Sequence, residues 1–448
     1  MSKFSVLSQL QWKGSNKTYA VPWLRNRIEF SADPERVKEY VKGGGFTRSQ
    51  LTRDMLTRFH LSNNSIVVSD DEHANVLRKL FRDKVPDRDS FPRIARELVD
   101  ELIASAKTLP SSATQSLSVS SSLIRENYLS ILRNMLGADL SSELVDAIRA
   151  TKLHPGTRPV HLEGVMFAFG LQLPGFAPMR KIVDLLFFKG EHYTRNIAQK
   201  FEKLVCKHAT PKPGSWYATL LTLRQNKALT EAQFKGEITS MLVSSFSLSA
   251  AMSSLMLCIA ARSEYLEKIR SDENMARYFV SEVLRLYPPF RRFGYEEKGI
   301  WTRKHRDKER ATDFMVSVAD LHRHEGVWND PEQFRPERFA VPRAASGCKY
   351  MPFGLGPRSC IGQLYSMQMM IEMLKYITSE NFGYKFTLPY DYAGDAEGLP
   401  IGISGRLISF PVDDRILVEK VIQVSANEQA DPQSHCEFAD GSLGDLAY

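Results

Sequence analysis

The stretch that decides the fold is FGLGPRSCIG, from Phe353 to Gly362, and it precedes an amphipathic segment that begins near Gln363. A cysteine thiolate is stabilised at a helix N-terminus, where the helix dipole is positive and backbone N–H groups point outward. Three glycines among these ten residues allow the backbone to turn tightly around the sulfur of Cys360. The stretch therefore predicts a metal-ligating cysteine, and the alternative is an inert buried cysteine beside a glycine turn.

Two upstream segments carry charged residues at spacings that fit a buried ion network. Glu282 and Arg285, in EVLR, are three positions apart and so share one face of a helix. The segment FRPERF, residues 334–339, contains Arg338. In order and spacing, these segments and FGLGPRSCIG resemble the ExxR, FxPERF and FxxGxRxCxG motifs of the cytochrome P450 family. The resemblance is strongest over residues 276–371 and implies that Arg338 joins Glu282 and Arg285.

The resemblance implies the cytochrome P450 fold, which is mainly α with small β-sheets. It also implies a heme b cofactor (iron protoporphyrin IX) whose iron is bound by Cys360. The resemblance implies that Phe353, Gly354, Arg358 and Gly362, which lie within this motif segment, surround that heme. Phe353 is expected to screen the sulfur from water, and Arg358 to place a cation beside the anionic cofactor.

Further arginines and one histidine are candidates for binding the heme propionates. The segment DDEHANVLR, residues 70–78, is similar to the family segment in which a His and an Arg do so. His73 and Arg78 are five positions apart, whereas the family spacing is four, so a surface helix is the alternative. Arg292 lies where the family has another propionate-binding arginine, with Arg291 as its rival and Arg358 as the third candidate. Guanidinium groups suit carboxylate oxygens, which supports these candidates chemically.

The long apolar segment Thr230–Ala261 departs from the family pattern. Typical monooxygenases of the family carry (A/G)Gx(D/E)T there, and the register of short soluble members places this motif on Val243–Ser247. Phe246 then occupies the acid position and Ser247 the threonine position, both of which we take as catalytic positions. Between residues 239 and 264 there is no other Asp, Glu or Thr to restore the motif. The alternative is that these serines only pack a helix against the heme.

The reaction implied by the resemblance is that of an oxidoreductase, a monooxygenase of a small, largely apolar or aromatic molecule of secondary metabolism. It would use O2 and electrons from a ferredoxin or flavodoxin docking at Lys79, Arg343 and Lys349. Because the acid is missing, radical or aryl coupling, peroxide-driven oxidation, and isomerisation or dehydration stay open. A non-catalytic heme-binding partner protein is the alternative from another class.

The substrate pocket is expected to combine the central segment with two later ones. Its expected wall residues are Phe246, Ser247, Ser245, Phe290, Phe293, Ile401 and Ile403. Residues 162–188 resemble the lid helices of the family and the loop between them; the alternative is that they belong to the hydrophobic core.

Composition narrows the classes of protein to which the chain could belong. The chain has 448 residues, a net charge of +7 and a balance of 43% hydrophobic and 25% charged residues typical of a globular protein. The basic residues are interspersed with 52 acidic ones, and no zinc-finger or basic-zipper pattern occurs, so nucleic-acid binding is not expected. No signal peptide or sufficiently long apolar run is recognised, which predicts a cytoplasmic protein without a membrane anchor. The five cysteines form no CxxC pair.

Domain organisation and secondary structure follow from patterning. We expect one heme-thiolate catalytic domain over residues 1–426 and a disordered acidic tail over 427–448, which contains no Lys or Arg. Ser111–Ser122 is expected to be a loop. Apolar periodicity predicts helices over Ser90–Lys107, Leu123–Leu136, Thr230–Ala261, Asn274–Leu286 and Gln363–Ser379, and strands over Ser65–Ser69, Asp313–Ala319, Phe382–Leu388 and Arg406–Pro411.

Overall fold

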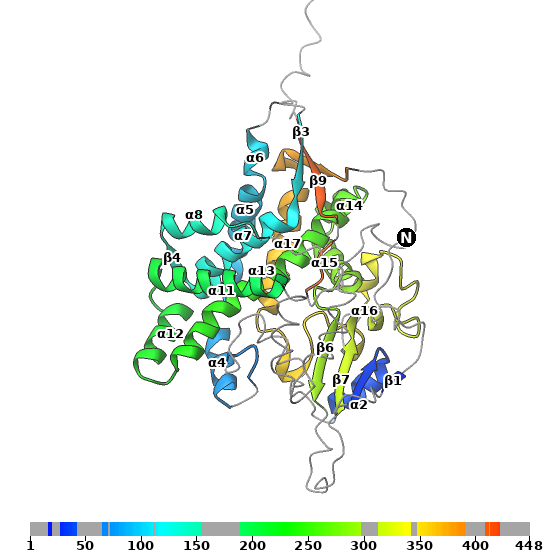
Figure 1. Ribbon diagram of the computed structural model, residues 1–448. Helices are drawn as coiled ribbons and strands as arrows, with labels where there is room; N and C mark the ends of the chain where they lie inside the picture. Colours follow the sequence, from blue (N-terminus) through cyan, green and yellow to red (C-terminus); the bar gives the residue numbers. More distant parts are fainter. Residues whose placement is uncertain are drawn as a thin grey trace, which may run out of the picture.

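The computed structural model describes residues 17–19, 27–42, 65–69, 72–108, 110, 113–153, 189–296, 312–341, 347–389, 408–411 and 413–421. Helices make up most of the body, which confirms the mainly α fold (Figure 1). They are α2 (Pro34–Lys42), α4 (Glu72–Arg82), α5 (Phe91–Leu102), α6 (Ala104–Lys107), α7 (Val119–Ile131), α8 (Ser142–Ala150), α11 (Lys189–His208), α12 (Trp216–Gln225), α13 (Glu231–Ala260), α14 (Tyr265–Ser271), α15 (Met275–Leu286), α16 (Val318–Leu321) and α17 (Gln363–Thr378).

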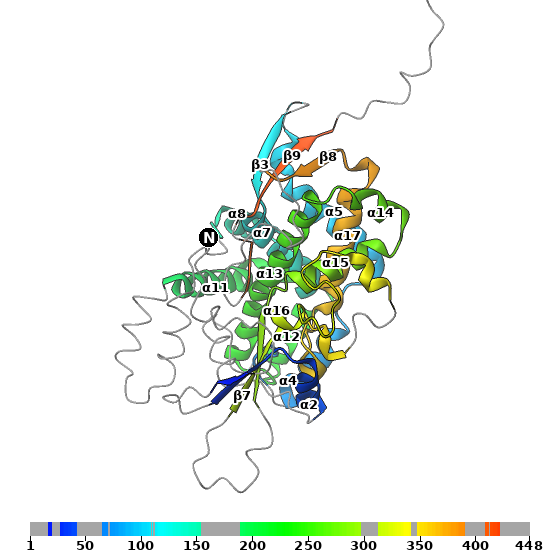
Figure 2. The same ribbon diagram turned by 90° about the vertical axis from the view of Figure 1, so that its right-hand side faces the viewer.

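Three small sheets lie at the edges of this helical body. The largest has the order β1-β2-β7-β6, in which β2 and β7 are parallel and the other neighbours antiparallel. A second sheet has the order β3-β9-β8, and β4 pairs with β5. Figures 1 and 2 show the first two at opposite ends of the molecule. The strands are β1 (Lys17–Tyr19), β2 (Arg27–Ser31), β3 (Thr114–Ser118), β4 (Ala138–Leu140), β5 (Ala209–Pro211), β6 (Arg292–Glu296), β7 (Thr312–Ser317), β8 (Tyr384–Thr387) and β9 (Arg415–Lys420).

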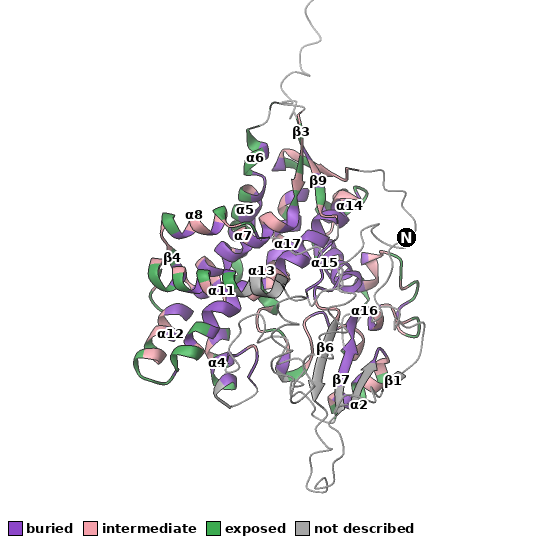
Figure 3. Cartoon of the chain, in the orientation of Figure 1, coloured by how far each residue is buried: buried purple, intermediate pink, exposed green. Residues whose placement is uncertain are grey.

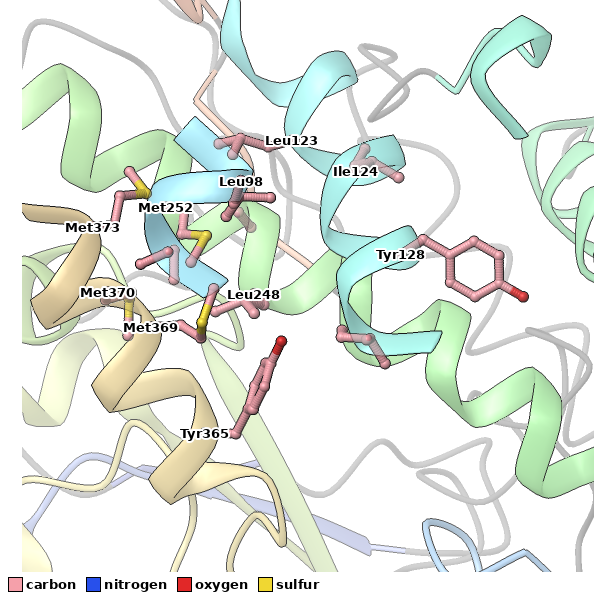
Figure 4. Close-up of a cluster of buried hydrophobic side chains, with 14 of the residues drawn as sticks. Leu98, Leu123, Ile124, Tyr128, Leu248, Met252, Tyr365, Met369, Met370 and Met373 are labelled. Atoms are coloured by element: carbon pink, nitrogen blue, oxygen red, sulfur yellow. The ribbon is translucent and has the colours of Figure 1, made fainter. Parts of the chain in front are cut away.

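Helix α13 lies at the centre of the hydrophobic core. It packs against α7, α11 and α15, while α17 packs against α5. Buried residues gather on α7, α13, α15 and α17 (Figure 3). The contact region shown in Figure 4 is rich in methionine, with Met252 on α13 facing Met369 and Met373 on α17. Methionine is flexible and fills irregular gaps, which suits a junction of helices that cross at different angles.

All five predicted helices are present, and their ends have local causes. Thr230 caps α13 through a capping box with Gln233, which fixes its start at the next residue. The predicted helix Ser90–Lys107 is interrupted at Ile103, which separates α5 from α6. Helix α7 begins at Val119, four residues before the predicted start, and ends in a π-helical turn, Leu132–Leu136.

Three sequence-based expectations about strands and loops were wrong. Ser65–Ser69 forms a turn rather than a strand, because the N–H groups of Val68 and Ser69 both donate to the Ser65 carbonyl. Ser111–Ser122 is not a plain loop, because residues 114–118 pair with β9 and a helix follows directly. Residues 408–411 of the predicted strand Arg406–Pro411 form no strand element; Pro411 makes only an isolated β-bridge, and Ser409 N donates to the Pro289 carbonyl after α15.

The two other predicted strands are present in shorter form. Asp313–Ala319 corresponds to β7, which ends at Ser317 because α16 begins at Val318. Phe382–Leu388 corresponds to β8, and Phe382 itself belongs to a 3-10 turn before it.

Within the described residues, one helix, α13, is long and apolar enough to cross a membrane by length and composition. Its most apolar window is 78% buried inside the protein, as expected of a core helix.

Candidate functional site

The loop of Cys360 lies between a short 3-10 turn, Gly356–Arg358, and helix α17. Its backbone is held at both ends, because Cys360 N donates to the Phe353 carbonyl at 2.8 Å and Gln363 N donates to the Cys360 carbonyl at 3.3 Å. Gly354 and Gly356 adopt φ angles of 72° and 66°, in the left-handed region that favours glycine. The Cys360 side chain is exposed, so the alternative of an inert buried cysteine is wrong.

A short turn, residues 65–69, joins the cysteine loop to two other parts of the chain. Arg358 donates to the Ser69 carbonyl at 2.9 Å. Arg78, on α4, donates to the carbonyls of Ile66 at 3.4 Å and of Ser359 at 2.6 Å. Both arginines are buried: Arg78 is 5% exposed and Arg358 is 9% exposed. The structure thus brings two of the predicted propionate-binding arginines together at the cysteine loop.

Behind this loop, Glu282 and Arg285 form a fully buried ion pair on α15. Arg285 Nε lies 2.7 Å from Glu282 Oε2, and Arg338 Nε lies 3.1 Å from Glu282 Oε1. Arg285 also donates to the carbonyls of His322, Pro331 and Gln333. A buried carboxylate with two guanidinium partners is stable only when such further hydrogen bonds are made. The contacts implied by the family motifs are all present.

His322 extends this network to the cysteine loop, and the sequence analysis missed it. Its Nδ1 lies 3.0 Å from the Arg285 carbonyl, and Met351 N donates to its Nε2 at 2.9 Å. Because Nε2 accepts, the ring proton is on Nδ1 and is donated to Arg285. Burial lowers the pKa of His322 to about 3, so the ring stays neutral. The signal was weak, because a lone histidine after a strand is most often structural.

The serine-rich part of α13 presents two hydroxyls at an open face. Ser247 is half-buried and Ser244 is exposed, and each donates to the carbonyl one turn earlier at 2.9 Å. Phe246 is half-buried against the main core. Ser245 is fully buried and its hydroxyl donates to the Leu242 carbonyl.

The same turn, residues 65–69, places this part of α13 near the cysteine loop. Val68 packs against Val243, and Ile66 N donates to the Glu237 carboxylate at 2.8 Å. The turn therefore contacts α13 on one side and the arginines of the cysteine loop on the other. Ser244 and Ser247 lie within four residues of Val243, the α13 residue that the turn contacts.

Several predicted residues contribute less or lie outside the described residues. Phe290 and Phe353 are half-buried and pack against the main core. Lys79 is exposed, whereas Lys349 lies over the Trp328 ring, with Nζ 5.7 Å from its centroid. Only the backbone is described for His73 in α4, and for Arg292 and Phe293 in β6; the Arg291 carbonyl accepts from Val318 N. Outside the described residues are Arg343, Ile401, Ile403, residues 162–188 and the tail 427–448.

These residues fit a heme bound through one sulfur. Among the described residues, no group of three or more His, Cys, Asp and Glu could hold a metal ion, so a multi-ligand protein site is not found there. A heme iron needs only one protein ligand, which the exposed cysteine on this tight loop would provide. Arg78 and Arg358 place cations at the cysteine loop, where an anionic porphyrin would need them.

Comparison with known proteins places this site in a family. A family model described as "Cytochrome P450" matches residues 5–380. Cytochrome P450 3A12 of Canis lupus familiaris is 36% identical over 115 residues, which are 24% of this chain and 21% of that protein. A probable cytochrome P450 4p2 of Drosophila melanogaster is 34% identical over 116 residues, 23% of this chain and 21% of that protein. The matched stretches thus span about a fifth of these relatives.

Among solved structures, a six-coordinated cytochrome P450 from Thermus thermophilus superimposes with a TM-score of 0.60 at 17% identity. The match covers 90% of this chain and 94% of that one. At this identity, the likeness shows a shared fold.

Proposed function

Since the chain belongs to the cytochrome P450 family, we propose that it is a heme-thiolate monooxygenase with Cys360 as the axial ligand to the iron of heme b. The observation that carries the proposal is the exposed thiol of Cys360 beside two buried arginines. When bound, the heme would supply the activation of dioxygen. The substrate would be a small, largely apolar or aromatic molecule, as in secondary metabolism, and a ferredoxin or flavodoxin would supply the electrons.

The chain's own residues have separable tasks in this proposal. The hydrogen bond from Cys360 N to the Phe353 carbonyl would help to fix the loop that carries the sulfur, and the N-terminus of α17 would favour its anionic form. Arg78 and Arg358 would bind the propionates, with His73 and Arg292 as further candidates. Ser247 would hold a proton or a water near the reacting oxygen, and Phe246 would exclude water beside it.

A second candidate is favoured by Phe246. A phenylalanine in the acid position supplies no proton, so coupling of substrate radicals, peroxide-driven oxidation, or isomerisation or dehydration would make smaller demands on proton delivery. A heme-binding partner protein without turnover would need no relay at all. For such a partner protein, the charged groups that we propose for donor docking, Lys79, Lys349 and Arg343, would be unnecessary. We further propose that the enzyme is cytoplasmic.

Heme ligation is tested by replacing the proposed ligand. Cys360→Ser is expected to abolish the ferrous carbonyl absorbance that is diagnostic of thiolate ligation, because a hydroxyl is a poor ligand for this iron. Cys206→Ser, on the other cysteine described as exposed, is the matched control and should keep the wild-type spectrum. The proposal fails when Cys360→Ser and wild type have the same spectrum. Turnover of candidate substrates with a reductant and with peroxide then separates the two reaction classes.

A further inference from the structure

Glu237 on α13 is a carboxyl group that the family motifs leave without a task. It has 0% exposure, and its Oε1 accepts the Ile66 N–H at 2.8 Å. Its Oε2 is buried and has no hydrogen-bond partner within the described part of the chain. Burial raises the pKa of Glu237 to about 8, although the Ile66 N–H opposes the shift. The group is therefore a protonated acid at neutral pH.

Glu237 lies at the head of a line of hydroxyl groups on one side of α13. Residues 237, 240, 244 and 247 are separated by three, four and three positions, which confines them to about 80° of the helix circumference. The three serine hydroxyls each donate to the carbonyl one turn earlier: Ser240 to Glu237, Ser244 to Ser240, and Ser247 to Ser244. Their lone pairs can still accept from water.

Burial changes along this line of side chains. Glu237 and Ser240 are buried, whereas Ser244 is exposed and Ser247 is half-buried. The line covers about 15 Å of helix, so the hydroxyls alone are too far apart and bridging waters must complete it. Ser65 Oγ, next to Ile66, is also buried without a protein partner, and buried polar groups of this kind commonly bind ordered water.

We propose that Glu237 is the acid that supplies protons to the site, and that Ser240, Ser244 and Ser247 with bridging waters carry them to the position of the family's threonine. The proposal rests on the proposed monooxygenase function. Hydroxylation of a substrate RH by O2 takes up two electrons and two protons and yields ROH and H2O. The electrons come from the reduced iron–sulfur or flavin partner. Glu237 loses its O–H proton to the line and regains one from solvent through water at Ser65.

A purely structural role for Glu237 predicts different behaviour. By accepting a hydrogen bond from Ile66 N, the carboxyl group of Glu237 steadies the turn whose carbonyls bind Arg78 and Arg358. Glu237→Gln separates the two roles, because the amide oxygen still accepts from Ile66 N but the side chain is no longer an acid. Ser244→Ala removes the exposed hydroxyl in the middle of the line. Glu202→Gln, on a 6% exposed glutamate of α11 near Lys235, is the matched control.

The first test compares two ways of driving one reaction in the heme-loaded protein. The probe is p-nitroanisole, driven either by O2 with NADPH, ferredoxin and ferredoxin reductase, or by hydrogen peroxide. Oxidation by peroxide, RH + H2O2 → ROH + H2O, takes up no net protons. Glu237→Gln and Ser244→Ala are expected to lower the O2-driven rate by on the order of 10²-fold, as for loss of a general acid, with peroxide-driven rates within about twofold. Glu202→Gln should retain both rates.

The second test needs no turnover. Infrared spectra of the resting protein across pH 6 to 9, roughly one to two units on either side of the raised pKa, should show a protonated carboxyl band that fades as pH rises. The band should be missing in Glu237→Gln and present in Glu202→Gln.

The outcomes are distinct. The relay would be overturned if Glu237→Gln and Ser244→Ala lowered the O2-driven and peroxide-driven rates equally, or left the O2-driven rate unchanged. It would also be overturned if Glu237→Gln removed no carboxyl band from the infrared spectrum. Inactivity of the wild type with both oxidants would count against the proposed function, and the infrared result would then decide the state of Glu237 by itself.

Discussion

At the scale of single residues, the buried carboxylate of Glu282 accepts four hydrogen bonds. Its Oε1 accepts from Arg285 Nη2, Arg335 N and Arg338 Nε, and its Oε2 from Arg285 Nε. The Glu282 and Arg285 side chains have 0% exposure. Two charges removed from water are tolerated because every partner is present, so the network is sensitive to the loss of any single member.

Glu282→Ala is therefore expected to destabilise the folded protein by about 3 to 5 kcal/mol, because it leaves two guanidinium groups without their buried counter-charge. Equilibrium unfolding in urea measures the change. The matched control is Glu267→Ala, which removes another i,i+3 Glu–Arg pair, at 3.4 Å to Arg270, but on the surface. Its cost should be about 0 to 1 kcal/mol. Equal costs for the two variants would show that the buried network adds no stability.

At the scale of elements, the loop before α17 is shaped by backbone conformation. Gly354 and Gly356 hold left-handed φ angles, and Gly354 N donates to the Met351 carbonyl at 3.1 Å. Gly362 is different, because its φ is −88° and a Cβ there would meet Cys360 Sγ at an ordinary 3.9 Å. The motif's glycines thus serve unequal purposes: the first two allow the turn, and the third caps α17.

Gly354→Ala should cost about 1 to 2 kcal/mol of stability, since a Cβ is disfavoured in the left-handed region. It should also weaken heme binding, because the strained loop carries the sulfur. Thermal unfolding and heme titration measure the two effects. Gly362→Ala is the control at an ordinary φ and should change stability by less. A Gly354→Ala protein as stable as wild type, with unchanged heme affinity, would contradict this account of the loop.

At the scale of the whole molecule, His322 connects parts of the chain that are far apart in sequence. It lies at the end of α16, after the four-stranded sheet, and its ring bonds reach Arg285 on α15 and Met351 before the cysteine loop. The neutral ring accepts from one segment and donates to the other. Protonation would turn its acceptor nitrogen into a donor facing the Met351 N–H, so acid should loosen the sheet, α15 and the loop together.

The sign of the resulting pH dependence follows from linkage. The pKa of His322 is depressed to about 3 in the folded protein. In the unfolded chain it is ordinary, about 6.5. As pH falls below that value, His322 binds a proton in the unfolded state but not in the folded state. The free energy of unfolding therefore decreases by up to about 1.4 kcal/mol per pH unit.

His322→Gln preserves one donor and one acceptor without titrating, so it should remove this slope between roughly pH 6 and 4. Urea unfolding across that range measures it. His324→Gln, on a half-exposed neighbour, should retain the wild-type slope. An unchanged slope in His322→Gln would contradict a neutral buried ring.

The sequence by itself determined the family and the Glu–Arg–Arg network and singled out Cys360 as the proposed sulfur ligand, because each depends on residue types at short, fixed spacings that local backbone geometry enforces. It also predicted the long helices from apolar periodicity. Sequence patterning did not predict the turn at Ser65–Ser69 or strand β3, because the conformations of both depend on partners distant in sequence. Only the tertiary structure brought the 65–69 turn against Glu237, Arg78 and Arg358, because burial and hydrogen-bond partners are properties of segments that meet in space. The acid that the central motif lacks is for that reason visible only in the folded chain.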